Sequence, residues 1–350
     1  MLRSRGMVRT GYLSPDYTAS LAGFGRPLVL ACSGGSLLER AVPGSADTDA
    51  MGPYPLFCCV DWSALPADLA RLAGRVVSVV VVTDPFGPGD PLGLSGAFSH
   101  GLTRYKDHAV IDLERPLETS ACSHHRRNAR KALARLMVEE LDEPRRYLET
   151  WCGLYGELIR RHRLSGMTCF SRESFAVQLA VPGLAAFRAV DDRGETAGMV
   201  LWYCQGEVAY YHLAAYSERG YVEKASYALF WRSAERLRDR VRWLSLGAGA
   251  GATCDGSDGL TRFKRGWTSL LRPTYLGRHV ASPRRYAELC RGRPASDFFP
   301  AYRAPVAAVA WGGRSGSAPA AMTSNDWARH CEDAEGKPIH GTRDHLRAAR

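Results

Sequence analysis

One lysine in the last third of the chain stands where a substrate could reach it. Residues 255–266 read Asp-Gly-Ser-Asp-Gly-Leu-Thr-Arg-Phe-Lys-Arg-Gly and follow a run of Gly and Ala. Glycine carries no side chain, so backbone that contains it lets a ligand come close. Lys264 directly follows Phe263, and Gly266 and Trp267 come two and three residues later. The pattern predicts an ammonium group beside an aromatic ring on accessible backbone.

The Gly/Ala run has several interpretations. Residues 247–252 read Gly-Ala-Gly-Ala-Gly-Ala, which formally satisfies the dinucleotide-binding pattern G-x-G-x-x-A. That pattern also needs a helix that opens at the run and an acidic residue about twenty positions later. A second turn follows instead, and no Asp or Glu occurs between Asp258 and Glu288. The open alternatives are a flexible loop and a loop whose backbone, at Gly247 and Gly249, passes close to a substrate.

A basic helix is predicted over residues 123–141. Its apolar residues and its cations fall on opposite arcs at the helical spacing of about 100° per residue. No acidic residue is interleaved among the cations, although surface helices commonly mix charges at i,i+4. A phosphate-binding face and a solvated surface both explain this pattern. The cations are Arg126, Arg127, Arg130, Lys131 and Arg135.

A carboxylate stands at the end of the buried strand predicted over residues 76–83. Asp84-Pro85 suits a turn, but a carboxylate at a strand end can also bind an amine or act as a base. Tyr211 and Trp267 belong to an aromatic set that is core by default, although such rings also stack on nucleic-acid bases. The sequence has no C-x-x-C and no G-x-S-x-G, which disfavours a zinc site and a serine hydrolase.

The composition is that of a globular protein with an excess of basic residues. The 350 residues suit two domains, and 46 Lys+Arg against 36 Asp+Glu give a formal charge of +10, which favours a polyanionic partner. Residues 1–15 lack the apolar segment of a signal peptide, and the longest apolar run, 76–82, is too short to span a bilayer. We expect a cytoplasmic monomer with free thiols and no membrane insertion.

Alternating strand-like and helix-like segments predict an α+β or mixed α/β fold. The Asp-Glu-Pro stretch at 142–144 marks a domain boundary, because proline cannot continue a helix. We predict domains over residues 1–142 and 143–303, followed by a flexible linker and polar tail over 304–350. Strands are predicted over 27–32, 76–83, 109–113, 185–190, 197–204, 207–214 and 241–246, and a further helix over 222–240.

Several short segments occur in an order that matches a known family. They are Gly-Pro-Tyr-Pro at 52–55, Asp-Pro at 84–85, Val-Ile-Asp-Leu at 110–113, the basic helix, Tyr-His-Leu-Ala-Ala at 211–215, Leu-Ser-Leu-Gly at 244–247 and Gly-Leu-Thr-Arg-Phe-Lys-Arg-Gly at 259–266. In these the chain resembles the Fem superfamily of aminoacyl-tRNA-dependent amino acid transferases. The resemblance implies two GNAT-like domains that face a common cleft, and formation of an amide between an aminoacyl-tRNA ester and an amine.

The resemblance also implies roles for the candidate residues. Lys264 would stabilise the tetrahedral oxyanion, and Asp84 would hold or deprotonate the acceptor amine. Phe263 and Trp267 would fix the lysine or stack on the terminal adenine of the tRNA. The remaining substrate-binding candidates are Tyr211, Gly247 and Gly249, and the candidates for tRNA phosphates are Arg126, Arg127, Arg130 and Lys131.

The implied donor is aminoacyl-tRNA, with no metal and no further cofactor. The acceptor would be a small-molecule amine. We favour an antibiotic precursor over a peptidoglycan precursor, with glycine as the donated amino acid, because some relatives transfer glycine onto streptothricin-like scaffolds. Two alternatives stay open: an acyl-CoA-dependent N-acyltransferase on the same fold, and a non-catalytic RNA-binding module. Residues 217–221, Ser-Glu-Arg-Gly-Tyr, depart from the acetyl-CoA pyrophosphate loop Arg/Gln-x-x-Gly-x-Gly/Ala, which argues against acetyl-CoA as donor.

Overall fold

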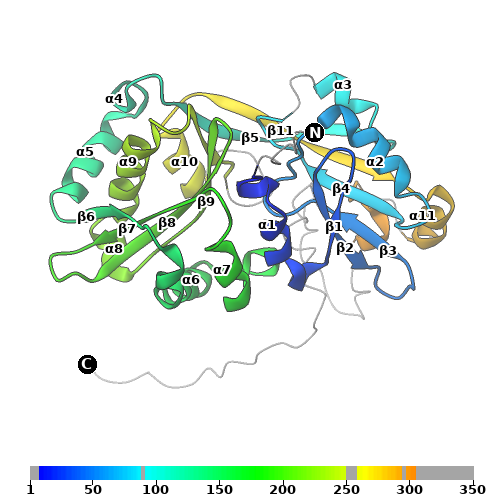
Figure 1. The fold of residues 1–350 in the computed structure, drawn as a ribbon, viewed down its shortest axis with the longest axis horizontal. Helices are drawn as coiled ribbons and strands as arrows, with labels where there is room; N and C mark the ends of the chain where they lie inside the picture. Colours follow the sequence, from blue (N-terminus) through cyan, green and yellow to red (C-terminus); the bar gives the residue numbers. More distant parts are fainter. Residues whose placement is uncertain (1–7, 88–90, 250–257, 294–296, 305–350) are drawn as a thin grey trace, which may run out of the picture.

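The chain forms one continuous mixed sheet with helices on both faces (Figure 1). The computed structural model describes residues 8–87, 91–249, 258–293 and 297–304. Within them, eleven strands lie in the order β1-β2-β3-β4-β11-β5-β10-β9-β8-β7-β6. This confirms the predicted mixed α/β class. The strands are β1 (Arg26–Val29), β2 (Ser36–Ala41), β3 (Thr48–Met51), β4 (Ser78–Val82), β5 (Leu102–Asp112), β6 (Met137–Glu140), β7 (Leu184–Val190), β8 (Thr196–Gln205), β9 (Val208–Tyr216), β10 (Trp243–Gly247) and β11 (Leu271–Val280).

The helices are mostly short and lie between the strands in the chain. The α-helices are α1 (Pro15–Ser20), α2 (Leu65–Arg71), α3 (Pro91–Ser95), α4 (Leu117–Ser120), α5 (Ser123–Leu133), α6 (Leu148–His162), α7 (Arg172–Gln178), α8 (Glu218–Val222), α9 (Ala225–Leu237), α10 (Gly259–Arg265) and α11 (Pro283–Cys290). Single-turn 3-10 helices are η1 (Gly11–Leu13), η2 (Ala22–Phe24), η3 (Trp62–Ala64), η4 (Pro144–Tyr147), η5 (Gly166–Thr168) and η6 (Ala301–Arg303).

The two halves of the sheet are built alike and exchange one strand. In the first half β3 and β4 pair in parallel and α2 connects them, whereas in the second half β9 and β10 pair in parallel and α8 and α9 connect them. The last strand, β11, returns to lie beside β4, and β5 lies beside β10. Because β5 and β11 pair with each other, they join the halves. The sheet is therefore continuous across residue 142, and the division at 142/143 stays a prediction.

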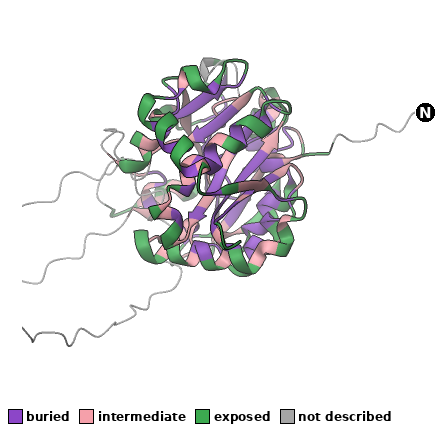
Figure 2. Ribbon diagram, turned by 90° about the vertical axis from the view of Figure 1, so that its left-hand side faces the viewer, coloured by how far each residue is buried: buried purple, intermediate pink, exposed green. Residues whose placement is uncertain are grey.

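The strands are buried between helices, and the outer sides of the helices carry the exposed residues (Figure 2). On one face of the second half α9 packs on β7 and β8, and α5 packs on α9. On the other face α6 packs on β9 and β8. Because neighbouring strand residues point to opposite faces, Leu201 and Trp202 of β8 enter two different apolar cores. The valines of β4 are likewise buried on both faces, which explains the apolar run in the sequence.

Two helix predictions were too long. The predicted helix 123–141 ends at Leu133, and Met137–Glu140 forms β6 instead, antiparallel to β7. Pairing with a distant strand outweighs the local helical pattern there. The predicted helix 222–240 is divided, because Lys224 between α8 and α9 has a left-handed backbone with φ of 61°.

Parts of the sequence prediction lie outside the described residues. These are the Gly/Ala run from residue 250, the turn that begins at Asp255, and the tail from residue 305 onward. Among the helices that are described, none is long and apolar enough to cross a bilayer.

Candidate functional site

A cavity of about 270 Å³ opens where β5, β10, β11 and α10 meet. Most of its charge is positive. Its charged lining residues are the cations Arg104, Lys106, Lys264 and Arg265 and the single acid Asp107, which pairs with Arg104 at 2.6 Å. Small residues also line it: Ala109 of β5, Gly247 at the end of β10, and Ala248 and Gly249 directly after it. The arrangement suits an anionic ligand.

Lys264 is the buried cation of this cavity. Its side chain is 7% exposed, and Nζ donates a hydrogen bond of 2.5 Å to the carbonyl oxygen of Ala248. It forms no ion pair with a carboxylate of the described residues, and Nζ lies 5.7 Å from the centre of the Tyr211 ring. Burial, together with the charge of Lys106, lowers the pKa of Lys264 to about 7. Its ammonium group is therefore only partly solvated, and neighbouring groups neutralise only part of its positive charge. Such a group is suited to stabilise a developing negative charge.

Two glycines make room for this lysine and its helix. Gly247 has φ of 77°, and a Cβ there would lie 3.1 Å from Lys264 Nζ. A Cβ on Gly249 would lie 1.8 Å from Thr261 Oγ1. Thr261 is held in turn by Asp258, which caps α10 by accepting the Thr261 N–H at 2.9 Å. The close approach of α10 to the backbone of residues 247–249 thus explains why glycine occupies positions 247 and 249. It also places Lys264 over the end of β10.

The lysine stands where two strands part. The parallel ladder between β9 and β10 ends at Tyr210 and Ser245, although β9 continues to Tyr216. Tyr211, which contacts Lys264, is the first β9 residue past this point. Past this point no ladder pairing joins β9 to β10 among the described residues, and Lys264 lies at this end of the ladder.

Phe263 and Trp267 anchor α10 to the protein core. Trp267 is fully buried and stacks on Phe230 of α9 with ring centres 4.9 Å apart. Phe263 packs edge-on against the same ring at 5.6 Å. Of the two roles considered for these aromatics, this packing favours fixing the lysine, because the buried Trp267 ring presents no surface to a nucleotide.

His125 and Gly266 complete this anchor. The His125 ring is buried, and its Nε2 lies 2.8 Å from the Phe263 carbonyl oxygen, which as an acceptor places the ring hydrogen on Nε2. A Cβ on Gly266 would lie 2.0 Å from the same ring, so this position accepts glycine alone. No pattern in the sequence indicates this role of His125, because adjacent histidines are usually surface residues or caps; only the tertiary contact with Phe263 shows it.

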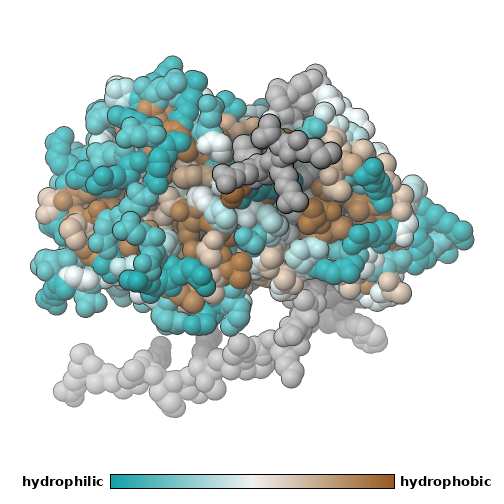
Figure 3. Space-filling view, viewed as in Figure 1, coloured by the Kyte–Doolittle hydropathy of each residue, from teal (hydrophilic) through white to brown (hydrophobic). Residues whose placement is uncertain are grey.

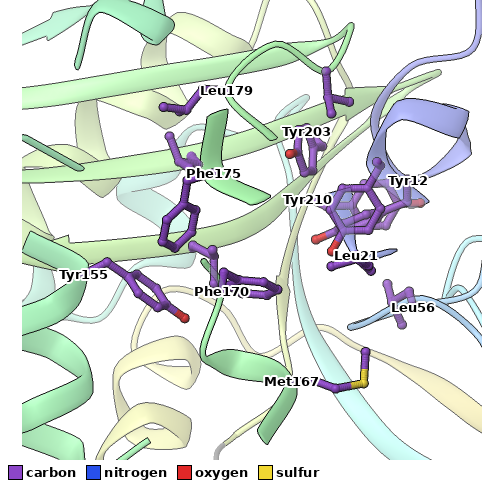
Figure 4. Close-up of a cluster of buried hydrophobic side chains, with 14 of the residues drawn as sticks. Tyr12, Leu21, Leu56, Tyr155, Met167, Phe170, Phe175, Leu179, Tyr203 and Tyr210 are labelled. Carbon is purple, nitrogen blue, oxygen red and sulfur yellow. The ribbon is translucent and has the colours of Figure 1, made fainter. Parts of the chain in front are cut away.

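Asp84 belongs to a second buried cluster. Tyr210 donates its hydroxyl to both Asp84 oxygens, at 2.9 and 2.8 Å, and the Phe86 N–H donates to Oδ1 at 2.9 Å. Burial raises the pKa of Asp84, whereas these hydrogen bonds and the charge of Arg272 oppose the rise. Figure 4 shows Tyr210 close to Tyr12 in the surrounding aromatic cluster, where their ring centres are 5.4 Å apart. Asp84 is thus a shielded carboxyl rather than an exposed base.

Asp84 and Lys264 reach β9 from opposite faces. Asp84 contacts Tyr210 and Lys264 contacts Tyr211, and neighbouring strand residues point to opposite sides. A bulge follows directly, since Leu201 pairs with Leu213 while Trp202 pairs with Tyr211. The structure therefore brings the two predicted catalytic residues to one point of one strand, but not into mutual contact.

The predicted tRNA-binding residues form an exposed surface, here called the basic face of α5. None of its four side chains pairs with a carboxylate of the described residues, whereas the neighbouring Arg135 pairs with Glu223 at 2.8 Å. Space-filling spheres over α4 and α5 in Figure 3 are largely hydrophilic. The helix begins beside α10, because the Cys122 N–H donates to the Gly266 carbonyl at 2.8 Å. The basic face consists of Arg126, Arg127, Arg130 and Lys131, all exposed.

Across the described residues, no group of three His, Cys, Asp or Glu side chains is placed to hold a metal ion.

One further polar group near Lys264 was missed from the sequence. His108 is buried on β5, its Nδ1 has no hydrogen-bond partner within the described residues, and burial with the charge of Lys264 lowers its pKa to about 3. It is therefore neutral at physiological pH.

Comparison with known proteins bears on the fold. No family model and no curated protein sequence matches the chain significantly. Solved structures do. The structure of FemX matches with a TM-score of 0.58 at 15% sequence identity, over 75% of this chain and 90% of that chain. The fold resembles that of FemX. L-PGS from Bacillus licheniformis matches with a TM-score of 0.50 at 14% identity, over 75% and 87% of the two chains.

Proposed function

We propose that the protein transfers an amino acid from aminoacyl-tRNA to an amine and forms an amide bond. The observation that carries the proposal is Lys264: a buried ammonium group without an ion pair among the described residues, at a cationic cavity, where β9 and β10 part. Similarity of fold to FemX and L-PGS supports the same class of reaction. The acceptor we favour remains an antibiotic precursor, and glycine the amino acid.

The ester of an aminoacyl-tRNA is already activated, so the protein has to orient it and stabilise the intermediate. The acceptor nitrogen attacks the ester carbonyl carbon, and the carbonyl oxygen becomes an oxyanion. The Lys264 ammonium donates a hydrogen bond to that oxygen, a contribution of about 2.7–4 kcal/mol for comparable donors. The C–O bond to the terminal ribose then breaks, the ribose oxygen takes up a proton, and the nitrogen loses one.

We assign Asp84 one of two roles: it accepts the proton that the acceptor nitrogen loses, or it binds the acceptor amine. Asp84 is buried together with Tyr210, whose hydroxyl donates to it at 2.8 Å. A proton could pass from the amine through that hydroxyl to Asp84, whose pKa is raised by burial. The basic face of α5, which begins beside α10, would hold the tRNA backbone.

The acyl-CoA alternative is disfavoured by residues 217–221, which form the N-cap and most of α8 rather than an open loop. The Gly220 N–H donates to Ser217 Oγ at 3.1 Å, and the Tyr221 N–H to the Ser217 carbonyl at 3.0 Å. A Cβ on Gly220 would lie 1.8 Å from the Ala197 carbonyl oxygen, so this helix packs directly on β8. Donors that a pyrophosphate would require are thus already used within the protein.

The test is incubation of the protein with total charged tRNA and a panel of amines, with amide products detected by mass spectrometry. Pretreatment with RNase should abolish the product, and acetyl-CoA should not replace the charged tRNA. An RNase-resistant, acyl-CoA-dependent product would establish the alternative enzyme. Tight RNA binding without any amide product would establish a binding module instead.

A further inference from the structure

An arginine on the face of the sheet opposite to α10 is held between two aromatic rings. The Arg272 guanidinium carbon lies 4.3 Å from the centre of the Phe86 ring and 5.0 Å from that of Trp243. The two rings are themselves in contact, with centres 5.8 Å apart at an angle of 49°. Planar guanidinium groups stack well on aromatic faces, and such stacking fixes their orientation.

The position of Arg272 follows from strand alternation. Leu271, the residue before it on β11, lines the Lys264 cavity. Arg272 therefore points to the other face, where Phe86 packs on Tyr210 with ring centres 6.3 Å apart. Arg272 thus lies on the Asp84 side of the point where β9 and β10 part. A ligand held by Arg272 would therefore lie on the same side of the sheet as Asp84, the proposed partner of the acceptor amine.

The donor atoms of Arg272 are not used. Its side chain makes no hydrogen bond and no ion pair within the described residues and is half-buried. Asp84 lies near enough for the charge of Arg272 to oppose the rise of its pKa, but no hydrogen bond or ion pair joins the two side chains within the described residues. Arg242, which lies over the same Trp243 ring at 4.9 Å, is different: it pairs with Asp112 at 3.5 Å and with Glu114 at 3.1 Å.

A fixed, half-desolvated guanidinium with free donors is a binding group for a planar or tetrahedral oxyanion. We infer that Arg272, held by Phe86 and Trp243, binds a carboxylate or phosphate group of the acceptor substrate, so that the acceptor is an anionic amine. The assignment of this anion to the acceptor rests on the proposed function. The anion site itself rests only on the geometry of the three side chains.

The anion site is tested without any activity. In protein labelled with ¹⁵N-arginine, the Arg272 Nε–H signal is identified by its loss in Arg272→Met. This signal is followed during titration with sodium acetate and, separately, with inorganic phosphate. At least one of the two anions should shift it saturably, and comparison of the two titrations shows whether the site prefers a carboxylate or a phosphate. The Arg242 signal, identified with Arg242→Met, should not shift. Absence of a saturable shift with both anions, or an equal shift at Arg242, overturns the site.

The assignment to the acceptor is tested with two probe amines, glycylglycine and glycylglycinamide, that differ in one carboxylate. Wild-type protein should transfer from charged tRNA to glycylglycine with kcat/KM at least about tenfold higher, as expected for a charge-assisted pair. Arg272→Met should lose this preference at unchanged KM for charged tRNA, whereas Arg242→Met should keep it. A rise in the KM for charged tRNA alone would assign Arg272 to the tRNA and overturn the inference. An anion-dependent shift without any transfer would support the site and count against the proposed function.

Discussion

Replacement of Lys264 by methionine should remove activity and at the same time stabilise the fold. Methionine keeps the length of the side chain but removes the charge. Loss of the only buried cation that lines the described cavity should cost about 2.7–4 kcal/mol of transition-state stabilisation, or about 10²- to 10³-fold in kcat. Binding of charged tRNA should change little, because the exposed basic face of α5 supplies most phosphate contacts.

The stability gain follows from the pKa of the buried lysine. A folded-state pKa of about 7 against 10.5 corresponds to about 5 kcal/mol of unfavourable free energy for the buried ammonium below pH 7. Between about pH 7 and 10.5 the unfolded chain binds the proton more tightly, so the free energy of unfolding of the wild type rises with pH in this window. Lys264→Met should lack this rise, and its advantage in stability should be greatest near pH 6 and vanish near pH 10.5.

The assays are single-turnover transfer from charged tRNA and urea unfolding at pH 6, 8 and 10. In the wild type, kcat should fall as pH rises through about 7, because the oxyanion needs the protonated amine; a rise would indicate a general base instead. Lys224→Met is a control, since this exposed lysine bonds Asn128 at 2.7 Å on the neighbouring helix and does not line the cavity. Wild-type turnover in Lys264→Met, or loss of turnover together with loss of stability, would refute the catalytic role.

Three other predictions concern the surroundings of the site. Glutamine at the four positions of the basic face should weaken tRNA binding and reduce the slope of log Kd against log salt by about 0.7–0.9 per lost phosphate contact; an unchanged slope in filter binding would contradict those contacts. Gly266→Ala should destabilise by about 1–3 kcal/mol in urea unfolding, because its Cβ would lie 2.0 Å from the His125 ring, whereas Gly259→Ala in the same helix has no atom within 4 Å and should not. Equal unfolding midpoints for the two variants would show that the ring moves freely. Tyr210→Phe should cost about 1–3 kcal/mol and raise the pKa of Asp84 further, because the carboxyl loses both hydroxyl contacts; unchanged stability from pH 5 to 8 would mean that the hydroxyl does not hold it.

The sequence by itself determined the elements with strong local signals and the lysine. The apolar valine run requires a strand buried on both faces, and the glycines around Lys264 require close backbone approach. The cations of α5 fall on one exposed side because helical periodicity alone fixes which residues share a face. The mixed α/β class follows from the alternation of such segments along the chain.

The tertiary structure decided everything that depends on residues far apart in the chain. Residues 137–140 became a strand because β7 offers an unpaired edge, although their local pattern is helical. The pairing of β5 with β11, the contact of the His125 ring with Gly266, and the contact of the Phe86 ring with Arg272 all join segments separated by more than 100 residues. Periodicity and propensity act over a few residues, so no pattern in the sequence could specify these contacts; close packing of one particular fold does.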